Sequence, residues 1–386
     1  MVQRLQPVCC WLWSSNSFLI SPAPAVKILH VEGGRNFYGG AHQILLLMEG
    51  LKARGIENIV ACRVGSDLSK AAAPLAEVHA IRMEGDLDLG LIPRLGQVIR
   101  ESRADLIHLH SRIGADVMGG IAGRLAGIPV VHSRRQDNPE SRLAVALKYR
   151  LHDRVIAISD AIGRILLSEG LPVAKLRCVK DAVEITPRVA QPERAWFRQT
   201  FDIPEEAPAL GLVAQLIERK GHSVLLEAMP KILAAFPETR VFFFGKGPLD
   251  EVLKTAVREK GLAHRVVLAG FRPDLDRILP CLDLVVHPAH REGMGVSLLQ
   301  ASLAEVPIVA TAVGGIPEAV KDGVTGVLVP PKDPNGLADA IITLLKHPER
   351  RREWGQAGRL WVENGFSADR MVEGNLAVYR ELLEER

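Results

Sequence analysis

A carboxylate stands directly ahead of a glycine turn and an apolar helix in the stretch REGMGVSLLQ, residues 291–300. Gly293 and Gly295 let the backbone come close to a ligand, and the unpaired amides at the start of a helix favour a phosphate group. Glu292 before the turn and Gln300 further along the helix could bind sugar hydroxyls. The stretch suits an anionic ligand that carries a sugar, although a capped helix with a surface carboxylate would show the same residues.

Two cations follow a strand-like run in QLIERKGH, residues 215–222. At the carboxyl end of a strand, Arg219 and Lys220 could neutralise the negative charge that grows on a diphosphate leaving group. A solvated basic turn is the alternative. The position of the pair favours the ligand site, because we expect Lys220 and Glu292 to line one solvent-accessible cleft.

A second glycine turn, NFYGGAHQ (residues 36–43), follows the first predicted strand and opens the first helix. Gly39 and Gly40 can approach a ligand from the opposite domain at this helix N-terminus. The turn is not a dinucleotide fingerprint, because the GxGxxG spacing is absent and no acidic residue follows a second strand in the usual place.

Two histidines share one face of the predicted strand DLIHLHS, residues 105–111, because side chains alternate along a strand. His110 is nearer the carboxyl end and could reach a bound sugar, whereas we expect His108 to be buried. No further ligands accompany them at zinc-type spacing, so we predict no metal site. The absence of a GxSxG elbow argues against a serine hydrolase.

Short aliphatic runs alternate with longer amphipathic stretches in two series, the first beginning at Val26 and the second near Ala209. This alternation predicts parallel sheets covered by helices on both faces. Between the series, ITPRVAQPERAWF (185–197) shows neither period and indicates a linker. We therefore expect an α/β protein with two doubly wound domains and a ligand beyond the carboxyl ends of the strands.

These patterns divide the chain into four parts. Residues 1–25 form an N-terminal extension, for which disorder is one interpretation, and its apolar run is too interrupted for a secretory signal. Rossmann-like domains are expected over 26–190 and 191–365. Residues 366–386 begin with a plausible N-cap, Ser367, and continue with apolar residues at helical spacing, which predicts a packing helix.

The 386 residues are 47% hydrophobic and 24% charged, which describes a folded globular protein long enough for two domains. No run of eighteen apolar residues predicts a transmembrane helix. The five cysteines form no CxxC pair, which favours reduced thiols in a cytoplasmic protein. We expect no nucleic-acid partner.

One stretch suggests contact with a membrane surface. SRLAVALKYRLH, residues 141–152, mixes leucines with Arg142, Lys148 and Arg150. Such a segment could dock on anionic lipid. An ordinary amphipathic helix packed on the sheet is the alternative.

The stretch HREGMGVSLLQASLAEVPIVATAVGGIPEAVKDGVTGVLVPPKDP, residues 290–334, resembles the donor-nucleotide region of retaining glycosyltransferases of family 4, also called group 1. Further similarity lies in YGGAHQILLLMEGLKARG (38–55), IAISDAIGRILLSEGL (156–171) and ERKGHSVLLEAMPKI (218–232). The resemblance covers almost everything from Val26 to Leu383. It implies the GT-B fold, in which two Rossmann-like domains, an N-terminal one for the acceptor and a C-terminal one for the nucleotide-sugar donor, face a central cleft.

The resemblance also implies roles for individual residues, and we predict Glu292, Lys220 and His110 as catalytic. Glu292 and His110 would contact the donor sugar, Lys220 would bind the diphosphate, and Gly40 would close over it from the N-terminal domain. Phe271 falls where the family lines the pocket for the nucleotide base. The residues implied to bind the donor are Gly39, Gly40, Gln215, Arg219, Phe271, Gly293, Met294, Gly295, Val296 and Gln300.

Two departures from the family pattern stand out, one at position 300 and one at positions 214 and 215. Gln300 stands where the family usually has a second glutamate for the ribose hydroxyls, and a glutamine carbonyl accepts such a bond without the strength of a carboxylate. Ala214 and Gln215 replace a common Gly-Arg pair, which removes one cation from the diphosphate site. Arg219 could substitute for it.

The implied activity is transfer of a sugar, with retention of anomeric configuration, from a UDP-, GDP- or ADP-sugar to a glycan or lipid-linked acceptor. Lipopolysaccharide, capsule or exopolysaccharide would be the product, and the enzyme would work in the cytoplasm or at the inner face of the cell membrane. No metal and no other cofactor is implied. Two alternatives stay open: a nucleotide-sugar epimerase of the same architecture, and a catalytically weak nucleotide-sugar binding protein, which the glutamines at 215 and 300 motivate.

Overall fold

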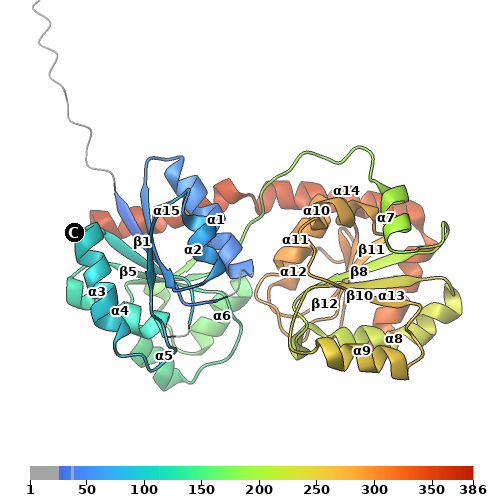
Figure 1. Cartoon of the computed structure of the whole chain (residues 1–386), viewed down its shortest axis with the longest axis horizontal. Helices are drawn as coiled ribbons and strands as arrows, with labels where there is room; N and C mark the ends of the chain where they lie inside the picture. The colour runs from blue at the N-terminus through green and yellow to red at the C-terminus, as the bar shows by residue number, and fades with distance from the viewer. Residues whose placement is uncertain (1–25, 36–38, 113, 386) are drawn as a thin grey trace, which may run out of the picture.

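The computed structural model describes residues 26–35, 39–112 and 114–385, and Figure 1 shows their arrangement. Two α/β units lie side by side, each with helices packed around its own parallel sheet. The extension predicted over residues 1–25 lies outside the described part of the chain.

The first sheet has seven strands among the described residues, in the order β3-β2-β1-β4-β5-β6-β7. The strands are β1 (Lys27–Glu32), β2 (Glu57–Arg63), β3 (Glu77–Ile81), β4 (Leu106–Leu109), β5 (Val130–Arg134), β6 (Arg154–Ala157) and β7 (Leu176–Cys178). The helices are α1 (Gly39–Lys52), α2 (Asp67–Ala72), α3 (Leu91–Ser102), α4 (Ala115–Ala126), α5 (Arg142–Lys148) and α6 (Asp160–Ser168), with a 3-10 turn η1 (Val173–Lys175). The chain reverses its direction of winding between β1 and β4, which makes this pair the switch point of the sheet.

The second sheet has six strands in the described chain, in the order β10-β9-β8-β11-β12-β13, and its switch point lies between β8 and β11. The strands are β8 (Ala209–Val213), β9 (Arg240–Phe244), β10 (Val266–Gly270), β11 (Leu284–His287), β12 (Ile308–Thr311) and β13 (Gly326–Val329). The helices are α7 (Arg194–Thr200), α8 (His222–Ala235), α9 (Asp250–Glu259), α10 (Leu275–Ile278), α11 (Val296–Leu303), α12 (Ile316–Ala319) and α13 (Pro334–Lys346), with 3-10 turns η2 (Glu218–Lys220) and η3 (Leu279–Cys281).

The strands at both switch points are buried because helices cover the two faces of each sheet. Every residue of β4, β11 and β12 is buried, as expected for the near-continuous aliphatic runs of central parallel strands. The paired strands run parallel throughout the registers of both sheets. The predicted pair of doubly wound sheets is therefore confirmed.

The segment that joins the two sheets is shorter than predicted. We expected an irregular linker over 185–197, but α7 begins at Arg194, and its Phe197 is buried against Phe242 of the second sheet. The apolar residues of this short helix were too few to reveal a helical period in the sequence. The ranges 26–190 and 191–365 for the two domains stay a prediction.

The C-terminal helices connect the second unit back to the first. α14 (Pro348–Gly365) packs on α11, and α15 (Ala368–Glu384) packs on α1 of the first unit, as Figure 1 shows. Ser367 caps α15 by accepting a hydrogen bond from the amide of Arg370. The predicted C-terminal packing helix is thus confirmed.

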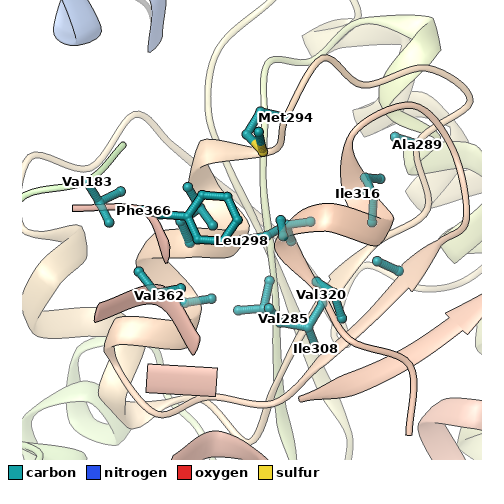
Figure 2. Close-up of a cluster of buried hydrophobic side chains, with 14 of the residues drawn as sticks. Val183, Val285, Ala289, Met294, Leu298, Ile308, Ile316, Val320, Val362 and Phe366 are labelled. Atoms are coloured by element: carbon teal, nitrogen blue, oxygen red, sulfur yellow. The ribbon is translucent and has the colours of Figure 1, made fainter. Parts of the chain in front are cut away.

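A buried hydrophobic cluster extends from the first unit into the second. Figure 2 shows the ring of Phe366 between Val183 and Leu298, and the amide of Val183 donates to the carbonyl of Phe366 at 2.9 Å. Contacts of this kind bury apolar surface between the two sheets and fix the segments that enter and leave α11.

Among the described residues, none of the helices combines the length and apolar character needed to span a bilayer. Of the five cysteines, Cys62, Cys178 and Cys281 are in the described part of the chain, and all three are free thiols.

Candidate functional site

Four candidate site residues follow the carboxyl ends of neighbouring strands in the second sheet. Three of them were predicted from the sequence, and Lys246 was not. Phe271 follows β10, Lys246 follows β9, Lys220 follows β8 and Glu292 follows β11. These four strands are consecutive neighbours, so their carboxyl ends lie about 4.8 Å apart from one strand to the next. The positions therefore form a row that ends at the switch point.

Glu292 is held by three groups at this switch point. The ammonium group of Lys220 donates to its Oε2 atom, the Nε2 atom of His287 lies 2.8 Å from the same oxygen, and the amide of Gly293 donates to Oε1 at 3.1 Å. Burial would raise the pKa of the Glu292 carboxyl, but the charge of Lys220 and the hydrogen bond of His287 outweigh burial and hold this pKa well below its usual value. Glu292 is therefore an anion at neutral pH.

The ion pair is less accessible than we expected from the sequence. Glu292 is 8% exposed and the side chain of Lys220 is 11% exposed, so neither lines an open surface. The expectation of a solvent-accessible position was wrong because Lys220, His287 and the amide of Gly293 surround the carboxylate, and the loop after β12 packs against the backbone of Glu292. A Cβ atom on Gly314 would collide with the carbonyl oxygen of Glu292, and the amide of Gly315 donates to that oxygen at 3.1 Å.

A carboxylate offers about four lone-pair positions, of which three are engaged here. The contacts with Lys220, His287 and Gly293 therefore leave one acceptor position of the Glu292 carboxylate unused. His287 has no counterpart among the residues predicted from sequence. Its signal was a single polar residue at the end of an aliphatic strand in LVVHP.

The glycine turn ahead of α11 has the backbone geometry that only glycine adopts readily. Gly295 is the N-cap residue of α11 and has a φ of +87°, and no side chain caps the first turn. The amides at this helix start, including those of Val296 and Ser297, lack intrahelical partners. Amides without intrahelical partners at a helix start favour an anion, and the binding of a diphosphate here stays a prediction.

The side chains near this turn differ in orientation. Met294 is buried in the hydrophobic cluster, as Figure 2 shows, so only its backbone can face a ligand. Val296 and Gln300 are half-buried on α11. The structure thus places Gln300 on the partly exposed side of the helix, one turn beyond Val296.

The loop after β8 contains Ala214 and Gln215, which replace the Gly-Arg pair that is common in the family. Gln215 is half-buried between β8 and η2. The guanidinium of Arg219 lies 3.9 Å from Asp137, which belongs to the loop after β5 in the first unit. Arg219 thus points toward the other sheet, and its substitution for the missing diphosphate cation stays a prediction.

Phe271 lies at the far end of the row. Its side chain is 61% exposed, and the ammonium group of Lys246 lies 5.8 Å from the centre of its ring. An exposed aromatic ring with a cation beside it can stack against a planar nucleobase, and the cation can bind a phosphate or ribose oxygen. Lys246 was not among the residues predicted from the sequence.

Arg135, directly after β5, connects the glycine turns of the two units. A Cβ atom on Gly293 would lie 2.6 Å from the Arg135 carbonyl oxygen, and one on Gly40 would lie 3.7 Å from the Arg135 side chain. The guanidinium of Arg135 pairs with Asp181. Burial raises the pKa of the Asp181 carboxyl, and the positive charge of Arg135 only partly offsets this effect. Gly39 and Gly40, which begin α1, thus lie on the same side of the molecule as Gly293.

His110 follows β4 in the first unit and is buried beside two other histidines. The centres of the His108 and His110 rings are 3.8 Å apart, and Nδ1 of His30 lies 3.0 Å from Nε2 of His110. The nearest ring nitrogens of the three residues lie within 4.8 Å of one another, a spacing that a metal ion could use. However, hydrogen bonds to protein groups engage both nitrogens of His30 and both nitrogens of His108. His30 was not among the predicted residues.

The first unit also contains a pocket of about 500 Å³ at the carboxyl ends of its strands. The residues that line it include Asp86, Arg112, Asp116, Glu140, Leu147 and Lys148. Lys148 pairs with Glu140 and lies 3.6 Å from Asp116, so the charged floor is largely neutralised internally. The loop from Arg135 through Asp137 to Glu140 leads from the contact with Gly293 to this pocket.

Glu318 of the second unit binds the N-terminus of α6 in the first unit. Glu318 accepts hydrogen bonds from the amides of Asp160 and Ala161 at 3.0 and 2.9 Å, and Lys180 pairs with it at 3.0 Å. Asp160 and Ala161 begin α6, where the positive end of the helix dipole favours an anion. This contact joins the two units to each other.

Comparison with known proteins identifies the family of this chain. A sequence profile described as glycosyl transferases group 1 matches residues 193–361, and one described as glycosyltransferase family 4 matches residues 38–186. D-inositol 3-phosphate glycosyltransferase from Kineococcus radiotolerans is 30% identical over 322 residues, which cover 74% of this chain and 73% of that protein. 2-Deoxystreptamine glucosyltransferase from Streptomyces kanamyceticus is 28% identical over 309 residues, which cover 72% and 78% of the two chains.

The crystal structure of Anabaena HepE in complex with UDP and glucose has the same fold. It matches with a TM-score of 0.83 and 21% identity over 92% of this chain and 100% of that one. The two matching profiles together with the relative at 30% identity establish the family. The chain belongs to glycosyltransferase family 4, the glycosyl transferases of group 1, and has the GT-B fold.

Proposed function

We propose that this glycosyltransferase moves a sugar from a nucleoside diphosphate sugar to a glycolipid or polysaccharide acceptor with retention of configuration. The partly buried pair of Lys220 and Glu292 carries the proposal, because it places a cation and an anion side by side at the switch point of the second sheet. The helix start at Val296 adds amides that suit the diphosphate.

In this proposal the row of strand ends binds the donor along its length. The base stacks on Phe271, Lys246 and Lys220 face the phosphates, and Glu292 accepts a hydrogen bond from a sugar hydroxyl. The phosphates carry the negative charge that grows as the sugar leaves, so preorganised cations and amides lower the barrier. UDP is the first nucleotide to try, because the similar HepE structure contains UDP and glucose.

The proposed reaction breaks the bond between the anomeric carbon and the diphosphate oxygen and forms a bond from that carbon to an acceptor oxygen on the same face. The acceptor proton passes to the departing phosphate oxygen. The products are the glycoside and the nucleoside diphosphate. Positive charge at the diphosphate comes from Lys220 and helix amides in this scheme, so we expect activity to persist in EDTA.

The acceptor would occupy the 500 Å³ pocket of the first unit. Its charged residues offer donors and acceptors to a polyhydroxyl group, and the adjacent α5 exposes Leu143 and Leu147, which are 70% and 55% exposed. A lipid-linked acceptor at the inner face of the cell membrane, as in lipopolysaccharide or exopolysaccharide synthesis, would use both features. A soluble cyclitol is the second candidate, because the two named relatives act on inositol 3-phosphate and 2-deoxystreptamine.

The test has two stages. Thermal unfolding is first measured with UDP-glucose, GDP-mannose and an ADP-sugar, since a ligand at a hundredfold excess over its Kd stabilises by about 2.7 kcal/mol. Transfer is then measured from the stabilising donor to lipid-linked and soluble acceptors, and the anomeric configuration of the product is read by NMR. Inversion would overturn the retaining mechanism.

The same assays separate the alternatives. Interconversion of the free donor without an acceptor would indicate an epimerase. Tight donor binding with neither hydrolysis nor transfer would indicate a binding protein.

A further inference from the structure

Three buried side chains, Asn58, His30 and His110, form a chain of hydrogen bonds across neighbouring strands of the first sheet. Asn58 lies on β2, His30 on the neighbouring β1, and His110 directly after β4 on the other side of β1. All three are buried, with exposures of 5%, 0% and 3%. The surroundings of these three side chains decide which atom donates and which accepts in each hydrogen bond.

The amide of Asn58 is fixed by backbone groups. Its Nδ2 atom donates to the carbonyl of Met48 at 2.8 Å and to that of Leu75 at 3.4 Å. Its Oδ1 atom therefore faces His30, whose Nε2 lies 3.2 Å away. An amide oxygen can only accept, so Nε2 of His30 must carry the proton.

The same constraint passes to the next ring. Burial lowers the pKa of His30 to about 4, so the ring is neutral at pH 7 and has only one proton. With that proton on Nε2, Nδ1 of His30 is an acceptor. Nε2 of His110, at 3.0 Å, must donate to it.

His110 is then left with an unprotonated Nδ1. Burial and the neighbouring histidines lower the pKa of His110 well below its usual value, so the second proton is absent at neutral pH. Among the described residues, this Nδ1 atom has no hydrogen-bond partner although it is buried. A buried acceptor without a donor is unfavourable, and a ligand that brings an O–H or N–H group removes the penalty.

We infer that Asn58 and His30 are positioning residues that hold His110 as the Nε2–H tautomer, so that its Nδ1 accepts a hydrogen bond from a hydroxyl of the donor sugar. The contact with the donor rests on the proposed function, whereas the tautomer rests on the hydrogen bonds alone. His110 in this state cannot protonate a leaving group, so its contribution is orientation of the sugar. A substrate without a hydroxyl at that position would leave the buried nitrogen unpaired and would bind less tightly.

The tautomer can be read without any ligand. The full chain is labelled with ¹⁵N at histidine, and long-range proton–nitrogen correlation at pH 7 distinguishes protonated from unprotonated ring nitrogens; a His110→Asn variant assigns the signals. We expect a protonated Nε2 and an unprotonated Nδ1 for His110. A protonated Nδ1, or a doubly protonated ring, would overturn the inference.

Two substitutions at one position test the role of Asn58. Asn58→Asp and Asn58→Leu both remove the bonds to Met48 and Leu75, but only the aspartate keeps an oxygen acceptor for His30. We expect Asn58→Asp to retain the His110 tautomer and Asn58→Leu to release it. The matched pair separates loss of the acceptor from loss of packing.

Binding supplies the functional readout. Affinity is measured for whichever of UDP-glucose and GDP-mannose binds the wild type, and for the corresponding nucleoside diphosphate. We expect Asn58→Leu to weaken the nucleotide-sugar about tenfold relative to Asn58→Asp, the loss of one hydrogen bond, and to leave nucleoside diphosphate affinity unchanged. Equal losses for both ligands would indicate a purely structural role and overturn the inference. If wild type binds neither donor, the proposed function fails, while the histidine spectrum still decides the tautomer.

Discussion

Lys220 and Glu292 form a partly buried ion pair across the switch point of the second sheet, although 72 positions separate them in the sequence. Each follows one of two adjacent strands, β8 and β11, so the fold alone brings them together. His287, at the end of β11, supplies the second bond to the same carboxylate oxygen. The ion pair is thus built by the carboxyl ends of two neighbouring strands and the loops that follow them.

Removal of either charge should reduce transfer strongly. We expect Lys220→Ala and Glu292→Gln each to lower kcat/KM about a hundredfold, because each removes a contact that we propose strengthens in the transition state. Kinetics with the donor identified by thermal shift give the measurement. Lys231→Ala, on an exposed salt bridge of α8, is the matched control and should keep full activity.

The two variants should differ in stability. Lys220→Ala leaves a buried carboxylate without its cation, which typically costs on the order of 3 kcal/mol, whereas Glu292→Gln keeps the shape and removes the charge. Melting temperatures of the single and double variants report the coupling. Near-normal transfer by both single variants would remove this pair from the proposed site.

The contact between Gly293 and Arg135 should be sensitive to one added carbon. A Cβ atom on Gly293 would lie 2.6 Å from the Arg135 carbonyl oxygen, a backbone atom that cannot rotate away. We expect Gly293→Ala to displace the glycine turn and to lower transfer up to about a hundredfold, with a smaller change in melting temperature. Gly96→Ala on α3, where the nearest atom is a flexible arginine end at 3.5 Å, is the control. Unchanged kinetics for Gly293→Ala would show that the turn tolerates displacement.

The sequence allowed Glu292, Lys220 and the glycine turn to be proposed because each follows an aliphatic run at a loop that starts a helix. It did not reveal His287, Arg135 or Lys246, since a lone polar residue at a strand end becomes meaningful only when the neighbouring strand is known. Strand order depends on crossover connections between distant segments, and local periodicity does not specify it.

Helix α14 illustrates a second limit. Its 18 residues begin PERRREWGQ, where charged side chains hide the apolar stripe, yet Gly355 and Val362 are buried. A Cβ atom on Gly355 would collide with the carbonyl of Glu305. Close approach of two backbones through glycine leaves no hydrophobic signal in the sequence, so this helix and its packing on α11 were not predicted.

Stability should fall as the pH decreases from 6.5 toward 4. Burial lowers the pKa of His152 in the folded state from 6.5 to about 4, and Nε2 of this ring lies 2.9 Å from the carbonyl of Asp116. Below pH 6.5 the unfolded chain therefore binds a proton that the folded chain does not, which favours unfolding by about 1.4 kcal/mol per pH unit. Above pH 6.5 both states are neutral and this group has no effect.

His152→Gln tests this origin of the acid sensitivity. A glutamine amide can still donate to the carbonyl of Asp116 but does not titrate, so we expect a shallower decrease in unfolding free energy between pH 6.5 and 5. Denaturant titrations across this range measure the slope. The exposed His264→Gln is the control and should keep the wild-type slope. An identical slope in His152→Gln would place the sensitivity in other groups.

The first unit should bind anionic membranes through α5. Only Val145 of this helix is buried, while Leu143 and Leu147 are 70% and 55% exposed and Arg142 is exposed beside them. An ordinary helix packed along the sheet would bury more of its apolar residues, so we expect insertion of the leucines with attraction of the arginine to lipid phosphates.

Co-sedimentation with phosphatidylcholine vesicles, with and without phosphatidylglycerol, measures this docking. We expect binding that requires the anionic lipid, weakens with salt and is lost in the double variant Leu143→Ser and Leu147→Ser. Val252→Ser, a 60% exposed position on α9 of the second unit, should bind as wild type does. Binding indifferent to lipid charge and salt would count against the docking surface.

Gln300→Glu tests the departure from the family pattern most directly. Gln300 is half-buried on α11, one turn beyond Val296, whose amide we propose contacts the diphosphate. If Gln300 faces the ribose, a carboxylate there forms charge-assisted hydrogen bonds about twice as strong as those of the amide, so donor affinity should stay equal or rise. Gln300→Met keeps the volume and removes the acceptor, and it should weaken the donor. Isothermal titration with donor and melting temperatures are measured for both variants. A Gln300→Glu protein that melts early and binds donor as wild type does would place position 300 in packing instead, since an added buried charge destabilises where no ligand hydroxyl meets it.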